Sequence, residues 1–316
     1  MAVTLAAIED ARRRIDGSAL RTPLVRLNCP AAPTDVYLKL ENLQPIGSFK
    51  IRGAANAMAR LSDEQLRRGV LTASAGNMAQ GVAWRARELG VPCTVVAPDT
   101  APAVKVEAIE RLGGRVILVP FERWWQTFQE RAYPGVDAVF LHAFDDPDVM
   151  AGNGTIGLEI LEDLPEVDAV VIPWGGGGLT CGIATAVRAM RAGCRLYAAE
   201  VATAAPLTAS LAAGSAVVVD YQPSFVDGIG SKTVFPQMLA RARALIDGSL
   251  VASLAEVAAA VRLLAERNRV IAEGAGACPV ACALAGKAGG GKVVCVVSGG
   301  NIDLKTLCKI SGQAPS

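Results

Sequence analysis

Histidine is almost absent from this sequence, which contains a single one, His142, among 316 residues. Aromatic residues make up only 5%, and no serine lies in a G-x-S-x-G pattern. A hydrolase that uses a serine, a histidine and an aspartate is therefore disfavoured, and we expect His142 to be structural rather than catalytic. The eight cysteines form no C-x-x-C pair. We therefore expect no metal site and reduced, mostly buried thiols.

Long apolar runs and blocks of like charge are also missing. No stretch reaches the roughly 18 apolar residues of a membrane span, and the N-terminal segment acquires charge too early for a secretory signal. The 31 basic and 30 acidic residues give a net charge of +1 and are spread along the chain. We therefore expect a cytoplasmic protein whose partner is a small molecule, with no nucleic acid and no membrane.

Short apolar runs that alternate with helical stretches fill most of the chain. Strands are predicted over 35–41, 69–74, 168–174 and 292–300, among others. The helical stretches between the strands include GAANAMARLSDEQLRRG (53–69) and NMAQGVAWRARELG (77–90). Buried strands that alternate with helices indicate an α/β fold, with parallel sheets and helices on both faces.

The first segment with chemical potential is ENLQPIGSFKIRG, residues 41–53. Its lysine, Lys50, stands after a Pro/Gly turn, where a helix is expected to begin. The positive end of a helix lowers the pKa of an amine or requires an anion nearby. A neutral amine can form a Schiff base with an aldehyde. Taken alone, this segment favours an ordinary surface lysine at a turn.

A second strand-to-helix turn contains Ser74, Ala75, Gly76, Asn77 and Met78. Small residues let backbone N–H groups approach an anion closely, and an asparagine adds a polar side chain. This pattern suits the carboxylate of a substrate. A simple helix cap explains it equally well when it is taken alone.

A run of four glycines, Gly175, Gly176, Gly177 and Gly178, follows a predicted buried strand and precedes Leu179. Successive glycines let several N–H groups converge on one anion at a helix N-terminus, so a phosphate is the expected ligand. A flexible turn is the less favoured alternative, because four glycines cost conformational entropy.

A dinucleotide-binding fold competes for the same segment, since Glu200 ends the next strand where an acidic residue would bind a ribose. However, no register gives G-x-G-x-x-G, because Thr180 or Cys181 occupies the last position.

The last predicted strand ends in VSGGN, and its Ser298 offers a neutral hydroxyl for a ring nitrogen or for a glycine turn.

These four segments, in this order, resemble the fold-type-II pyridoxal-phosphate enzymes, in particular threonine and serine dehydratases and serine racemases. The resemblance rests on ENLQPIGSFKIRGA, SAGNMAQG, LHAFDDPDVMAGNGT, GGGGL and SGGN, and it covers nearly the whole chain. It implies two open, twisted, mostly parallel sheets flanked by helices. It also implies a small domain over 66–145, a large cofactor-binding domain formed by 1–65 and 146–316, and a homodimer.

The resemblance assigns roles to single residues. Lys50 would hold pyridoxal 5'-phosphate as a Schiff base and later move the Cα proton of an amino-acid substrate. The implied cofactor-binding residues are Phe49, Lys50, Asn77, Gly175, Gly176, Gly177, Gly178, Leu179, Glu273 and Ser298. The implied substrate-binding residues are Ser74, Ala75, Gly76, Asn77 and Met78.

Three departures from the family pattern affect the expected reaction. Serine racemases have a serine where this chain has Ala75, so a second acid/base group is missing. Met78 replaces the usual histidine and Ala143 the usual proline, which would make the pocket less polar. Pro206 replaces the aspartate of a cation-binding run in which Glu200 and Ala204 match, so no metal is expected.

The predicted activity is therefore β-elimination from a β-hydroxy amino acid such as L-threonine or L-serine, which gives a 2-keto acid and ammonia. A bulkier substrate such as phenylserine or hydroxyaspartate, an amino-acid racemase and a β-replacement enzyme are the alternatives within the family. A nicotinamide dehydrogenase and a catalytically silent binding protein are the alternatives outside it.

Overall fold

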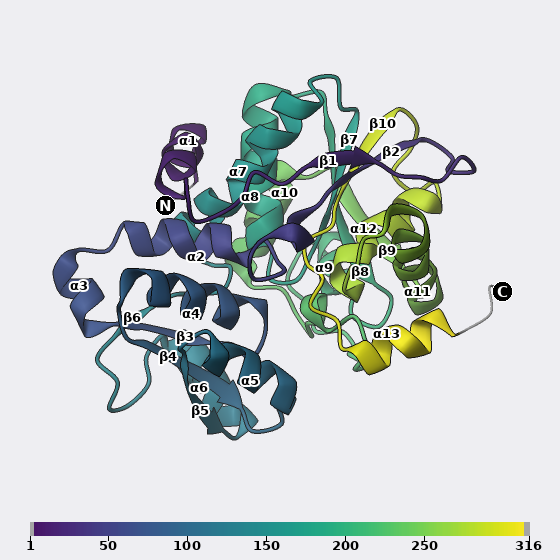
Figure 1. Cartoon of the computed structure of the whole chain (residues 1–316). Coiled ribbons are helices and arrows are strands. Elements are labelled where there is room, and N and C mark those ends of the chain that lie inside the picture. Colours follow the sequence, from purple (N-terminus) through teal and green to yellow (C-terminus); the bar gives the residue numbers. More distant parts are fainter. Residues whose placement is uncertain (1–2, 313–316) are drawn as a thin grey trace. The chain divides into compact units, whose positions relative to one another are not determined.

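The computed structural model describes residues 3–312, which form two β-sheets (Figure 1). The six-stranded sheet has the order β1-β2-β10-β7-β8-β9, and the four-stranded sheet has the order β5-β4-β3-β6. Within the sheets of the described chain, every strand pairing is parallel except that of β1 with β2. The predicted α/β class with mostly parallel sheets is confirmed.

The chain divides into two compact units. The first extends to Leu20 and resumes over Gln44–Thr155, and the second comprises Arg21–Leu43 and Ile156–Ser316. All strands of the four-stranded sheet fall within 66–145, the range predicted for the small domain. The first unit also includes 44–65 and 146–155. The predicted domain boundaries stay a prediction.

The first unit contains the four-stranded sheet, and most of the helices of this unit alternate with its strands along the chain. Its elements are α1 (Leu5–Arg14), α2 (Lys50–Ala59), α3 (Asp63–Arg68), β3 (Val70–Ala73), α4 (Asn77–Leu89), β4 (Cys93–Pro98), α5 (Ala103–Arg111), β5 (Arg115–Val119), α6 (Phe121–Glu130) and β6 (Val139–Phe140). Helix α7 (Pro147–Asp163) begins in this unit and ends in the other, because the division falls after Thr155.

Side chains that alternate between the two faces of this sheet pack into a separate apolar core on each face. Val70 and Val95 pack with apolar residues of α2 and α4. Their neighbours in sequence, Leu71 and Val96, pack with Trp124 of α6 instead. Because successive side chains of a strand point to opposite faces, α4 and α6 cover opposite faces of the sheet.

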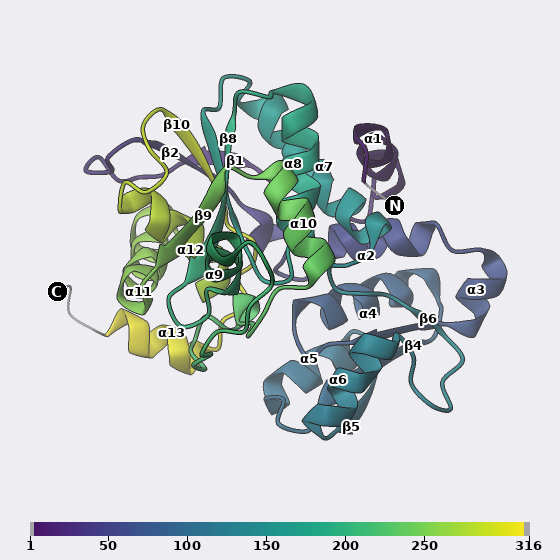
Figure 2. The ribbon, with the colours of Figure 1, turned by 180° about the vertical axis from the view of Figure 1, so that it is seen from behind.

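The second unit holds the six-stranded sheet. Its elements are β1 (Leu24–Arg26), β2 (Asp35–Lys39), η1 (Glu41–Leu43), β7 (Ala169–Pro173), α8 (Gly178–Met190), β8 (Arg195–Val201), α9 (Pro206–Ala213), η2 (Asp227–Ile229), α10 (Pro236–Leu245), β9 (Gly248–Ala252), α11 (Leu254–Leu263), the π-helical turn η3 (Leu264–Asn268), α12 (Gly274–Leu284), β10 (Lys292–Val296) and α13 (Leu304–Ser311). Helices α11 and α12 pack together, and so do α8 and α10, which lie side by side in Figure 2.

Most predicted elements agree with the structure to within one or two residues, but two do not. The helix predicted over 53–69 is two helices, because Ser62 and Gln65 form a capping box that starts α3. The strand predicted over 292–300 ends at Val296. No helix in the described part of the chain is both long and apolar enough to cross a bilayer.

Candidate functional site

Lys50 is the first residue of α2, as the sequence predicts, and its side chain is half-buried. The Nζ amine donates a hydrogen bond of 2.7 Å to the carbonyl oxygen of Ala143. It also lies 5.1 Å from the ring centroid of Phe49, the residue before it. These two contacts hold the amine of the residue that begins α2.

Close contacts between backbones hold α2 in place. A Cβ atom on Gly81 of α4 would lie 3.1 Å from the carbonyl carbon of Lys50. Helix α7 also packs against α2, and a Cβ on its Gly152 would overlap the carbonyl oxygen of Arg52. Neither position leaves room for a side chain without movement of the helix backbone. The glycines thus fix the helix that presents Lys50.

The predicted carboxylate loop lies next to this helix. Strand β3 ends at Ala73, α4 begins at Asn77, and Gly81, which touches Lys50, is one turn further along α4. Ser74 Oγ accepts a hydrogen bond of 3.1 Å from the N–H of Gly76. No side chain caps the first turn of α4, so its N–H groups suit an anion.

The side chain of Met78 lies in the protein core. Met78 is only 2% exposed and packs in the apolar core of the first unit with Met58 and Val82. Ala143 packs against the same core. The less polar pocket expected from these two residues stays a prediction. The backbone of Met78 still lies in the first turn of α4.

The turn after β6 supplies the acceptor for Lys50, a contribution that sequence reasoning missed. His142, which begins the turn, is 1% exposed, and its Nδ1 accepts hydrogen bonds from the N–H groups of Phe144 (3.2 Å) and Asp145 (2.8 Å). Burial, and then the charge of Arg131, lowers the pKa of His142 to about 3. The imidazole is therefore neutral at ordinary pH.

In the second unit, the glycine run forms the turn between β7 and α8. Gly177 has a φ of +90°, and a Cβ there would lie 2.7 Å from Cζ2 of the Trp174 ring. A Cβ on Gly175 would lie 3.2 Å from the carbonyl oxygen of Gly228. The N-terminus of α8 has no side-chain cap and no acidic residue in its first turn. Its N–H groups are thus arranged for an anion.

Ser298 and Glu273 lie at the same edge of this sheet as the glycine turn. Strand β10 pairs with β7 in parallel, so their carboxyl ends are adjacent. Ser298 follows β10 and is 3% exposed, and the N–H of Glu273 donates to the carbonyl oxygen of Gly299 at 3.0 Å. A Cβ on Gly228, which neighbours Gly175, would lie 3.5 Å from Glu273 Oε1. The structure thus brings these predicted residues together.

Glu200 has a structural role. Its carboxylate accepts hydrogen bonds from the N–H groups of Leu207 (2.8 Å) and Thr208 (2.7 Å) at the start of α9. It also accepts from the hydroxyls of Thr208 and Ser249. The carboxylate therefore caps the N-terminus of α9. Among the described residues, no group of three or more His, Cys, Asp or Glu side chains could hold a metal ion.

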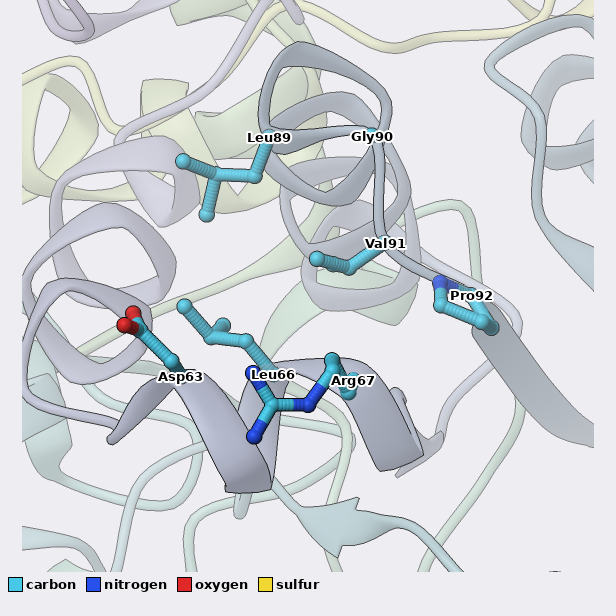
Figure 3. A pocket seen from close by; sticks show the side chains of 7 residues that line it. All are labelled: Asp63, Leu66, Arg67, Leu89, Gly90, Val91 and Pro92. Carbon is cyan, nitrogen blue, oxygen red and sulfur yellow. The ribbon is translucent and has the colours of Figure 1, made fainter.

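Two surface pockets are lined by residues other than the predicted site residues. One, of about 410 Å³, lies in the first unit between α3 and the end of α4 (Figure 3). Figure 3 shows Leu66 and Leu89 extending into it from the two helices, with Asp63 and Arg67 at α3. The other, of about 890 Å³, lies in the second unit around the β1–β2 connection.

Known proteins resemble this chain along most of its length. The family described as "Pyridoxal-phosphate dependent enzyme" matches residues 15–299. An L-threonine ammonia-lyase from Thermotoga maritima is 41% identical over 286 residues, which cover 89% of this chain and 71% of that protein. Another from Geobacter sulfurreducens is 42% identical over 290 residues, covering 88% and 70%.

Solved structures show the same fold. Maize serine racemase superposes with a TM-score of 0.91 at 32% identity, covering 98% of this chain and 97% of that one. The processed threonine deaminase isoform 2 of Solanum lycopersicum gives a TM-score of 0.87 at 33% identity, covering 97% and 92%.

Proposed function

Because the chain belongs to the family of pyridoxal-phosphate-dependent enzymes, we propose that it is an ammonia-lyase that acts on a β-hydroxy amino acid such as L-threonine or L-serine. The products are a 2-keto acid and ammonia. The observation that carries this proposal is the similarity to L-threonine ammonia-lyases over almost nine-tenths of the chain. A nicotinamide dehydrogenase, the competing interpretation, has no support in these relatives.

The residues of each unit fit the cofactor. Lys50 offers an amine at a helix N-terminus for the aldehyde, and the turn from Gly175 to Gly178 offers N–H groups for the phosphate. A Cβ at Gly177 would fill the space over Trp174, so the turn needs glycine there. When bound, pyridoxal phosphate supplies the electron sink that acidifies the Cα proton of the substrate.

Lys50 is the group that we assign to proton transfer at Cα. A base at this step must be neutral and oriented. The carbonyl of Ala143 accepts a hydrogen bond from the Lys50 amine and so directs the lone pair of a neutral amine away from that carbonyl. The N–H groups at the start of α4, with Ser74 and Asn77, would bind the substrate carboxylate.

Two further residues bias the reaction toward elimination. We assign Ser298 to the ring nitrogen of the cofactor, where a neutral hydroxyl does not fully protonate the ring. Ala75 has no acid or base group, so Lys50 is the only assigned base and racemisation is expected to be weak. Phe49, Leu179 and Glu273 complete the assigned cofactor contacts. We further propose a cytoplasmic homodimer that binds no nucleic acid or membrane.

The test combines absorbance with product analysis. Purified protein with pyridoxal phosphate should absorb at about 410–420 nm, the range expected for a lysine-bound cofactor. It should form keto acid from L-threonine or L-serine, and both signals should be lost in Lys50→Ala. Persistence of the band in that variant, or no keto acid from these substrates, 3-hydroxyaspartate or 3-phenylserine, would overturn the proposal. Chiral analysis of residual substrate measures racemisation.

A further inference from the structure

The acceptor of the Lys50 amine is a backbone carbonyl whose direction depends on one peptide unit. Residues 142–146, here called the acceptor turn, connect β6 to α7, and the carbonyl of Ala143 points to Lys50 Nζ. Any residue has a carbonyl, so the chemistry at this position depends on its orientation. The groups that orient this peptide therefore act on Lys50.

His142 holds the other end of the same peptide unit. The N–H of Phe144, which donates to His142 Nδ1, and the carbonyl of Ala143 belong to one amide. A trans amide is planar, and its N–H and C=O point in opposite directions; the chain has no cis peptide among its described residues. Fixing the N–H on the imidazole thus directs the carbonyl toward the amine.

We propose that His142 is a positioning residue for Lys50 and acts through the peptide bond between Ala143 and Phe144. This inference rests on the proposed function. The imidazole accepts at Nδ1 and carries its hydrogen on Nε2. In this way the only histidine of the chain determines where one N–H of the Lys50 amine is bound and where its lone pair points.

The surroundings of His142 keep it in the accepting state. Its ring centroid lies 4.5 Å from that of Phe128 and 4.6 Å from that of Phe144. The charged groups that act on it are Arg131, Asp145 and the Lys50 amine, and burial is the largest effect on its pKa. Protonation at Nδ1 would abolish the acceptor, and burial among aromatic rings opposes that change.

Separate contacts anchor the rest of the acceptor turn. Arg131 pairs with the Asp145 carboxylate at 2.8 Å and also donates to the carbonyl of that residue at 3.2 Å. Asp146 Oδ1 accepts from the N–H groups of Asp148 and Val149 and so caps the start of α7. Since these contacts do not involve the imidazole, replacing His142 should release the N–H groups of Phe144 and Asp145 while the rest of the turn stays anchored.

Two variants separate positioning from stability. His142→Asn keeps a side-chain acceptor near the position of Nδ1, whereas His142→Leu removes it. For the Leu variant we expect kcat to fall about three- to tenfold, as for one lost hydrogen bond, with KM little changed. The Asn variant should recover most of this loss. The denaturation midpoint of each variant reports any merely structural effect.

A readout independent of turnover uses the full chain without cofactor. Lys50 is labelled with acetic anhydride across pH, and its peptide is quantified by mass spectrometry against the exposed lysine Lys305. The half-labelling pH of Lys50 should shift by about half a unit or more in His142→Leu and by less in His142→Asn. An unchanged profile in the Leu variant, or equal effects in both variants, overturns the proposal.

Nitrogen NMR tests the acceptor state even if a variant fails to fold. With ¹⁵N-histidine the folded wild-type chain has one imidazole, so its two nitrogens need no assignment by mutation. The proposal requires the Nε2–H tautomer from about pH 5.5 to 9, given the usual histidine pKa near 6.5. An Nδ1–H signal would overturn it. Failure of the proposed function would instead appear as no keto acid from the wild type, with these two readouts unaffected.

Discussion

Replacing Gly177 by alanine tests the glycine turn that we assign to the cofactor phosphate. This residue has a φ of +90°, a conformation that alanine resists, and its new methyl group would lie 2.7 Å from Cζ2 of the buried Trp174 ring. Gly214, at the end of α9, is a matched control. It has a φ of +73°, but a methyl group there would meet nothing within 4 Å.

The difference between the two variants isolates the contact with Trp174. A positive φ costs a residue with a Cβ about 1–2 kcal/mol in both variants, and the lower entropy of the unfolded chain offsets about 0.4–1 kcal/mol of it. Overpacking against the buried ring adds about 1–3 kcal/mol at Gly177 alone. We therefore expect Gly177→Ala to be about 1–3 kcal/mol less stable than Gly214→Ala.

Two assays on the full chain check this expectation. Denaturant unfolding of the cofactor-free protein gives the stability difference, and a spectrophotometric titration gives the affinity for pyridoxal phosphate. If Gly177→Ala turns one N–H away from the phosphate, the affinity should fall about tenfold or more, whereas Gly214→Ala should bind like the wild type. Equal unfolding midpoints and equal affinities in the two variants would refute the assigned role of the turn.

Two other predictions concern α2 and the acceptor turn. Gly152→Ala places a methyl group 2.8 Å from a carbonyl carbon of α2, so it should destabilise the fold by about 1–3 kcal/mol, whereas Gly193→Ala, which meets no atom within 4 Å, should not; similar unfolding midpoints would contradict this. Because folding lowers the pKa of His142 from 6.5 to about 3, the unfolded chain binds the proton first as pH falls. Relative to His142→Asn, the wild type should therefore lose about 1.4 kcal/mol of stability per pH unit between about pH 6 and 4, and parallel stability curves would exclude this linkage.

Much of the fold follows from local sequence patterns. Short apolar runs bounded by turns predicted the strands, because a strand that is buried on both faces is apolar at nearly every position. The break between α2 and α3 was missed since the periodicity of 53–69 continues across it, while the capping box at Ser62 ends one helix and starts another. A local hydrogen bond thus overrides the hydrophobic pattern.

Sequence reasoning was less complete for the candidate site. Lys50 alone suggested only a lysine at a turn, and it became a candidate through the resemblance of four segments in order, whereas the glycine turn stood out because four successive glycines cost entropy. It missed the carbonyl of Ala143, since every residue has a backbone carbonyl and only the fold gives one of them a direction. It also did not predict that Met78 packs in the core, because this depends on residues of α2 that are distant in sequence.

The way α2 is held limits how this enzyme can be re-engineered. Gly81 and Gly152 bring two helix backbones against the backbone that presents Lys50, so no change of side-chain rotamer can absorb an added atom there. A side chain added at either glycine would therefore have to displace a helix backbone. Diversity near Lys50 is better introduced at Ala75 and Gly76, where the loop is half-buried and a Cβ on Gly76 meets no atom within 4 Å.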